Sequence, residues 1–178
     1  MSSAFDLIPG FQPENDLEGR VAADPQLLEG VAWGRPRKGH PEGSVGRHVG
    51  DLLQKIDEWG ESGDRRSDLR FLALVHDSLK SEVDNWRRRV GENHHAMRAR
   101  RFAERYTDDE RLLAAIELHD QPYHIWKRHQ RTGNPQDAAV QRMLDRIPDR
   151  DLFLRFVELD TSTEGKNPAP LEWLWERV

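Results

Sequence analysis

The sequence predicts an all-α protein built as a single helical domain, and three observations predict it. Apolar residues recur at steps of three and four along most of the chain, which is the period of a helix with one buried face. No segment shows the alternation of apolar and polar residues that is typical of a strand. The length of 178 residues suits one domain with a sizeable core, and no internal repeat interrupts it.

The composition excludes several classes of protein. Charged residues make up 33% of the chain and the net charge is −5, which argues for a soluble protein and against nucleic-acid binding driven by overall charge. There are no cysteines, so disulfides, thiolate nucleophiles and cysteine-ligated zinc are excluded. No apolar run approaches the roughly 18 residues of a membrane helix, and the N-terminus lacks the pattern of a signal peptide. We therefore expect a cytoplasmic protein that does not associate with membranes.

The first third of the chain is predicted to lead into a long helix. Residues 1–22 contain two prolines and show little periodicity, so we expect an irregular arm. Asp24 and Pro25 are typical of the cap and first residue of a short helix, which should end near Gly30. A loop rich in glycine and proline follows over residues 34–43. The next helix carries an apolar stripe: Val45, Val49, Leu52, Leu53 and Ile56.

The remaining elements are predicted to be helices joined by short breaks. The break at residues 61–67 precedes a helix whose inner face ends at His76. Residues 90–106 predict another helix, and "TDDE" at 107–110 predicts a capping box for a helix that runs to about His119 and is ended by Gln121-Pro122. Further helices are expected after Asn134-Pro135, after Pro148, and over residues 171–178 following a loop at 161–170.

Several histidines and carboxylates share the buried faces of these helices. His76, for example, follows Leu72 by four residues and precedes Leu79 by three. The residues that lie on or beside an apolar stripe are His48, His76, His95, His119 and Asp160, and Asp77 directly follows His76. One buried histidine is more often a hydrogen-bonded core residue than a ligand. Buried carboxylates without a partner are expensive, however, and a divalent cation would satisfy the whole set.

The ordered set resembles the HD-domain superfamily of metal-dependent phosphohydrolases. The resemblance covers roughly residues 30–166, and we take residues 23–178 as the domain. "HPEGSVGRHV" (40–49) is similar to the segment that opens the HD domain of bacterial CCA-adding enzymes, and "VHDSLK" (75–80) is similar to the HD-x-x-K signature. "HAMRARRFAERY" (95–106) and "ELDTSTEGK" (158–166) resemble two further family segments. Members usually carry glycine where this chain has Leu79, a departure that puts catalytic turnover in doubt.

The resemblance implies a ligand for each candidate residue. His48, His76, Asp77 and Asp160 resemble the ligands of a first metal, and His95 and His119 those of a second, with Asp77 shared. His94 competes with His95, and since neighbours on a helix are about 100° apart, we expect only one to point at the site. We choose His95 because Ala99 follows it by four residues, as in the family. We expect surface or loop positions for His40, His124 and His129, and we assign Asp120 no role.

The implied chemistry is hydrolysis of a phosphoester by a metal-activated water, with one or two ions of iron, manganese, magnesium, cobalt or zinc. Asp77 would hold the metals, and Lys80 would act at the reaction centre and bind phosphate, although a solvated lysine at a helix end is equally compatible. Arg98 and Lys166 are further candidates for binding an anionic substrate.

Three functions follow from the resemblance and stay open on the sequence alone. The first is a hydrolase of a nucleotide, a cyclic phosphate or a nucleic-acid end. The second is a di-iron oxygenase that uses a similar ligand set. The third is a metal- and ligand-binding module without turnover. Family resemblance does not specify function or assembly, so both a monomer and a homodimer stay open.

Overall fold

The structure, a computed structural model, describes residues 3–36, 38 and 41–178 and confirms the all-α class. Within that part of the chain the one extended pairing is an isolated bridge between Gly34 and Ser44. The α-helices are α1 (Ala4–Leu7), α2 (Asp16–Ala22), α3 (Pro25–Ala32), α4 (Val45–Glu58), α5 (Gly63–Val75), α6 (His95–Ala103), α7 (Glu110–Leu118), α8 (Gln121–Thr132), α9 (Asp137–Leu144), α10 (Arg150–Thr161) and α11 (Ala169–Trp175). Two short 3-10 helices, η1 (Lys80–Glu82) and η2 (Gly91–Asn93), lie between α5 and α6.

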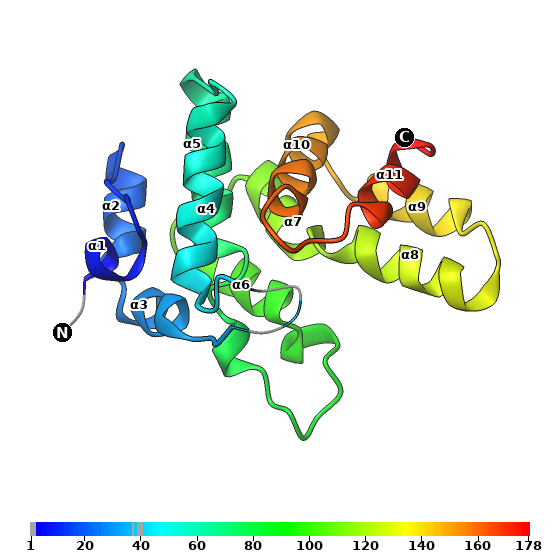
Figure 1. Cartoon of the computed structure of the whole chain (residues 1–178), viewed down its shortest axis with the longest axis horizontal. Helices are drawn as coiled ribbons and strands as arrows, with labels where there is room; N and C mark the ends of the chain where they lie inside the picture. The colour runs from blue at the N-terminus through cyan, green and yellow to red at the C-terminus, as the bar shows by residue number, and fades with distance from the viewer. Residues whose placement is uncertain (1–2, 37, 39–40) are drawn as a thin grey trace.

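The long helices α4 and α5 pack against each other in the middle of the molecule (Figure 1). Helix α10 contacts α4, α5 and α7, and these helices enclose a core that includes Leu52, Leu72, Ile116 and Phe153, all at most 1% exposed. Helices α1 to α3 cover one side, and α8, α9 and α11 form the opposite end (Figure 1). The described helices include none that is long and apolar enough to span a membrane.

The prediction of an irregular arm over residues 1–22 is wrong for residues 4–7 and 16–22, which are helical. Helices α1 and α2 form there, and the segment buries Ile8, Phe11 and Val21 in the core. A buried ion pair holds α2 against α5: Arg70 donates from Nε and Nη2 to the two carboxylate oxygens of Glu18, over 2.9 and 2.8 Å. The helices are too short to show periodicity, so long-range contacts rather than local pattern order this segment.

Several helix boundaries also differ from the prediction. The helix expected at 90 begins at His95, because residues 91–93 form η2 and His94 is an extended N-cap. Asp109 rather than Thr107 caps α7. The sequence pattern does not predict α8, whose buried residues are Pro122 and Ile125 alone, and α9 begins at Asp137 rather than directly after Pro135. A helix with so narrow a buried face gives little hydrophobic periodicity.

Candidate metal centre

The structure brings all six predicted ligands together from five helices. His48 lies on α4, His95 opens α6, and Asp160 lies in the last turn of α10. His76 and His119 are the residues that end α5 and α7, and Asp77 follows His76. Where a helix ends, its side chains can reach a shared point between helices. His48, His76, Asp77 and His119 are all at most 6% exposed.

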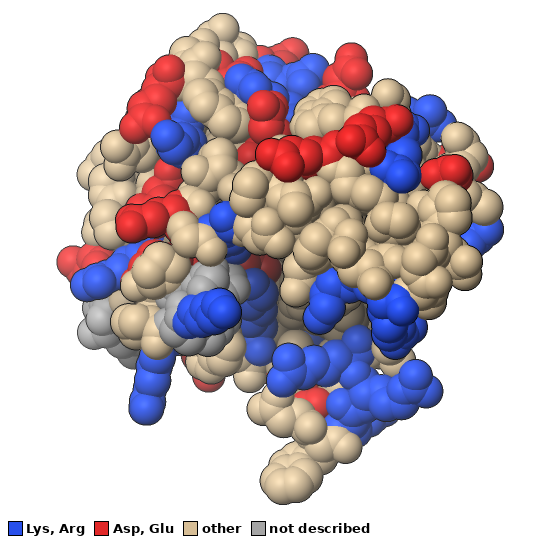
Figure 2. Space-filling model, turned by 45° about the vertical axis from the view of Figure 1, so that its right-hand side comes forward, with Lys and Arg blue, Asp and Glu red and all other residues tan. Residues whose placement is uncertain are grey.

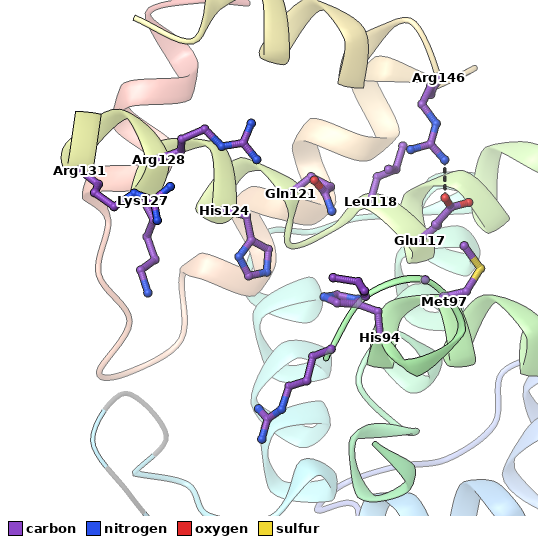
Figure 3. Close-up of a pocket in the computed structure, with 13 residues that line it drawn as sticks. His94, Met97, Glu117, Leu118, Gln121, His124, Lys127, Arg128, Arg131 and Arg146 are labelled. Atoms are coloured by element: carbon purple, nitrogen blue, oxygen red, sulfur yellow. Dashed lines mark hydrogen bonds and ion pairs between the residues drawn. The ribbon is translucent and has the colours of Figure 1, made fainter. Parts of the chain in front are cut away.

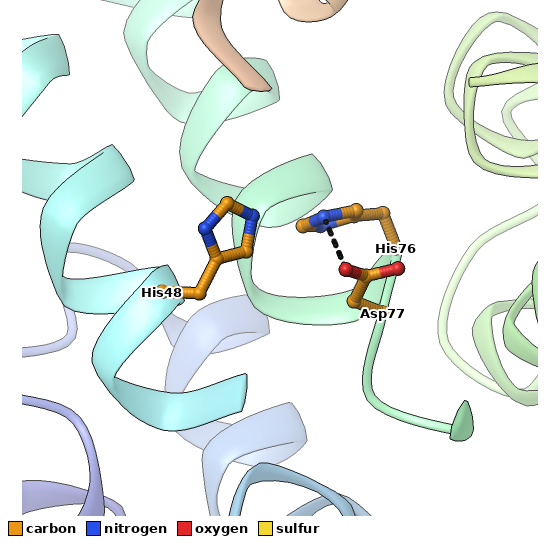
Figure 4. Close-up of side chains that lie close together, drawn as sticks. All are labelled: His48, His76 and Asp77. Carbon is orange, nitrogen blue, oxygen red and sulfur yellow. Dashed lines mark ion pairs between the residues drawn. The ribbon is translucent and has the colours of Figure 1, made fainter. Parts of the chain in front are cut away.

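The first group of donor atoms lies between α4, α5 and α10. One donor atom each from His48, His76 and Asp77 lies within 4.8 Å of the others, and Figure 4 shows the three side chains converging. His76 Nε2 is 3.3 Å from Asp77 Oδ2. Asp160 Oδ1 completes this side of the centre, at 2.9 Å from His48 Nε2 and 3.7 Å from His76 Nε2. Imidazole nitrogens and carboxylate oxygens at this spacing suit a divalent first-row metal.

The second group shares Asp77 with the first. Asp77 Oδ1 lies 3.5 Å from His95 Nε2 and 3.6 Å from His119 Nε2, and the three residues form a second set of close donors. The two oxygens of one carboxylate therefore face different groups of histidines. Asp77 thus belongs to both groups of candidate donors.

Hydrogen bonds to the backbone orient two of these imidazoles. Nδ1 of His76 contacts the carbonyl oxygens of Leu72 and Ala73 at 3.1 and 3.2 Å, and Nδ1 of His119 contacts that of Ile116 at 2.8 Å. A carbonyl only accepts, so Nδ1 carries a proton in both rings. In the neutral form of either ring, the lone pair of Nε2 then points toward Asp77. Metal-ligating histidines usually show this pattern of one nitrogen bound to the backbone and the other free.

Two unsatisfied polar atoms lie among these side chains and fit a site for a cation. His76 Nε2 and Asp77 Oδ1 are buried and have no hydrogen-bond partner. Buried polar atoms without a partner are costly in a low-dielectric interior. The donor set, its orientation and its unsatisfied atoms therefore fit a metal ion.

The electrostatics of the protein without metal follow from the same contacts. Burial lowers the pKa of His95 to about 3, so this ring is neutral, which is the form that binds a metal. Burial also opposes the charged form of His119, but the carboxylates of Asp77 and Asp120 outweigh it and raise the pKa to about 9. Burial would raise the pKa of Asp77, but Lys80 and His76 hold it well below its usual range.

A cavity of about 920 Å³ opens onto the centre. Asp77, His95, His119 and Asp160 lie in its wall. Cationic side chains also line it: Lys38, Lys80, Arg89 and Lys166. The cavity therefore combines candidate metal ligands with positively charged side chains.

The predicted substrate-binding residues differ in where they lie. Lys80 and Lys166 line the cavity, and Lys80 Nζ pairs with Asp77 Oδ2. Arg98 does not line it, because its guanidinium turns toward Glu82, at 3.6 Å, and donates to Asn93. Arg98 therefore lies outside this cavity and contacts the loop that contains Asn93.

Asp120 is the residue that sequence reasoning missed. Its Oδ2 lies 3.1 Å from His124 Nε2, 3.3 Å from His94 Nε2 and 3.7 Å from His95 Nε2, and its Oδ1 is buried without a hydrogen bond. A signal was present, since His119-Asp120 repeats the His-Asp pair of residues 76–77. Asp120, His94 and His95 form a third set of close donors beside the second.

The expectation that only one of His94 and His95 can point at the site is wrong in its premise. His94 is not helical, with ψ of 134°, so its ring lies beside that of His95, with centroids 4.6 Å apart. His95 faces both Asp77 and Asp120, whereas His94 faces Asp120. His124 is exposed but lines the cavity, His129 stacks on Trp173 away from the centre, and His40 lies outside the described residues.

Comparison with known proteins adds no assignment: no family model, no curated protein and no solved structure matches this chain.

Proposed function

We propose that the protein is an HD-type phosphohydrolase that cleaves a phosphoester with the help of one or two divalent metal ions. The observation that carries the proposal is the carboxylate of Asp77, whose two oxygens face two histidine groups at the wall of a cavity lined by cations. Buried histidines on a shared carboxylate favour metal, and the cations favour an anionic substrate. The cavity volume is in the range of sites for nucleotide-sized ligands.

The ligands would divide between two ions. His48, His76, Asp77 and Asp160 would hold the first, and His95 and His119 would hold the second together with Asp77. When bound, such ions polarise a phosphoryl oxygen and lower the pKa of a water molecule, so that no side-chain nucleophile is required. A mechanism without a side-chain nucleophile is compatible with a chain that has no cysteine.

The remaining polar residues of the cavity would act on the substrate. Lys80 and Lys166 can neutralise phosphate oxygens, since both line the cavity that contains Asp77 and Asp160. Asp120 has an unsatisfied Oδ1 and lies beside three histidines, so it can accept a proton or fix the orientation of these rings.

The test is a hydrolysis screen with defined metal content. Protein loaded with manganese, iron or cobalt should release phosphate or alcohol from nucleotides, cyclic nucleotides or nucleic-acid ends under anaerobic conditions, and chelation should abolish the release. Lys80→Ala should lower kcat/KM roughly 10- to 150-fold without releasing metal, since one charge-assisted contact is lost. His129→Ala is the matched histidine control, because His129 belongs to none of the donor groups.

A loaded protein that hydrolyses no phosphoester but consumes oxygen with an organic substrate would move the protein to the oxygenase class. A loaded protein that does neither but binds nucleotide would be a regulatory module. Either result would overturn the hydrolase proposal while leaving the metal ligands as assigned.

A further inference from the structure

The loop between η1 and η2 displays a tryptophan to solvent. Trp86 is 98% exposed, and it is followed by three exposed arginines, Arg87, Arg88 and Arg89. A tryptophan ring with no protein neighbour exposes more apolar surface than the occasional surface aliphatic residue. A ring held out among cations suits a planar, negatively charged partner.

The loop is held in shape by a buried side chain. Asn93 is 5% exposed, and its carboxamide accepts from the amide of Asp84 at 2.9 Å and donates to the carbonyls of Asp84 and Arg88 at 3.0 and 3.1 Å. The carboxylate of Asp84 in turn accepts from the amide of Trp86 at 2.8 Å. These bonds fix the backbone on both sides of the tryptophan, so its display is a property of the fold.

A second cavity, of about 650 Å³, lies beside this loop, and five of the residues that line it are lysine or arginine. Figure 3 shows Lys127, Arg128 and Arg131 along α8, with His124 turned toward His94. Arg146 is neutralised by Glu117. Within the described part of the chain, no ion pair neutralises the other cations of this cavity: Arg89, Lys127, Arg128 and Arg131.

The basic cavity adjoins the cavity of the metal centre. Arg89, His94 and His124 line both. Figure 2 shows Lys and Arg side chains gathered around a hollow on the face that contains this region. A path of positive charge thus leads from the loop of Trp86 to the donor groups.

We propose that this surface binds single-stranded nucleic acid, with a base stacked on Trp86 and the phosphates held by Arg87–Arg89 and the basic face of α8. Exposed aromatic rings and a basic groove are the two features by which proteins bind single strands without sequence preference. That the bound strand delivers its phosphoester to the metal centre rests on the proposed function; the binding itself does not. The substrate class is then an oligonucleotide rather than a free mononucleotide.

The shape of the surface favours a strand over other polyanions. The cations Arg89, Lys127, Arg128 and Arg131 line a concave hollow, which a flat lipid bilayer cannot enter. The net charge of −5 does not oppose this, because the unpaired cations are concentrated on one face and act within about a Debye length of 10 Å.

Binding is tested on the full chain with a fluorescently labelled 12-nucleotide RNA and its DNA counterpart, by anisotropy in the presence of a chelator. Trp86→Ala should weaken binding roughly 5- to 150-fold, the effect of losing one stacked base. The double variant Lys127→Glu, Arg131→Glu should weaken binding and flatten its dependence on salt. The matched controls Trp175→Ala and Arg142→Glu change exposed residues outside both cavities and should bind as the parent protein does.

Equal binding by the parent protein and Trp86→Ala, with matching circular dichroism, would overturn the proposal. So would binding to vesicles of phosphatidylserine and phosphatidylcholine in preference to either oligonucleotide, which would indicate a membrane surface. Measuring binding with a chelator separates this inference from the proposed hydrolase. Strand binding without hydrolysis after metal is restored would overturn the hydrolase proposal alone. Hydrolysis of nucleotides without strand binding would overturn the present inference alone.

Discussion

Replacing Asp77 with asparagine should remove the stabilisation of the protein by divalent metal. Asp77 belongs to both donor groups, so asparagine, which has the same shape but no charge, weakens both at once. A ligand at 100 times its Kd stabilises the native state by about 2.7 kcal/mol per site. For a chain of 178 residues, 1 kcal/mol shifts the Tm by about 2–4 °C, so manganese at that concentration should raise the Tm by about 5–11 °C per site.

The assay compares the melting temperature with and without manganese in each variant, so that any change in the baseline stability of the variant cancels. His76→Ala and His119→Ala should each remove one part of the rise, because each residue belongs to one group. Asp57→Asn, an exposed carboxylate paired with Arg66, is the matched control and should keep the full rise. A full rise in Asp77→Asn would refute the assignment of Asp77 as the shared ligand.

Three further predictions concern the framework around the centre. Arg70→Met should lower the free energy of unfolding by about 3–5 kcal/mol in urea titrations, because the buried carboxylate on α2 loses its partner; a change below about 1 kcal/mol would contradict this. Gly30→Ala should lower the free energy of unfolding by about 1–3 kcal/mol or more and weaken metal binding, because the new Cβ would lie 1.7 Å from the carbonyl oxygen of Ser78, next to His76 and Asp77. An unchanged Tm in this variant would contradict the close packing of Gly30 on Ser78. Burial acts to raise the pKa of Asp24, but the hydrogen bond from Tyr106 helps to hold this pKa below its usual value. Tyr106→Phe should therefore lower the free energy of unfolding at pH 7. The difference in stability between the parent protein and the variant should shrink as the pH falls below 3.8, where Asp24 becomes protonated.

The sequence by itself determined the helical class and the inner faces of the principal helices. Periodicity is a local property, since residues three and four apart share a side of any helix, whatever that helix packs against. His48 and His119 could therefore be assigned to buried faces from their neighbours alone. The same reasoning could not find α2 or α8, because short helices with few buried residues leave little periodic signal.

The tertiary structure alone decided which of the inward-facing residues meet. His48 and Asp160 are 112 positions apart and come within 2.9 Å because α10 packs on α4. The path of the backbone after α7 places Asp120 beside His94, and a hydrogen bond to Asn93 turns Arg98 away from the cavity. Local pattern states on which side of a helix a residue lies, but the distance between residues on different helices depends on packing angles and on where each helix ends, and these are set by the whole core at once.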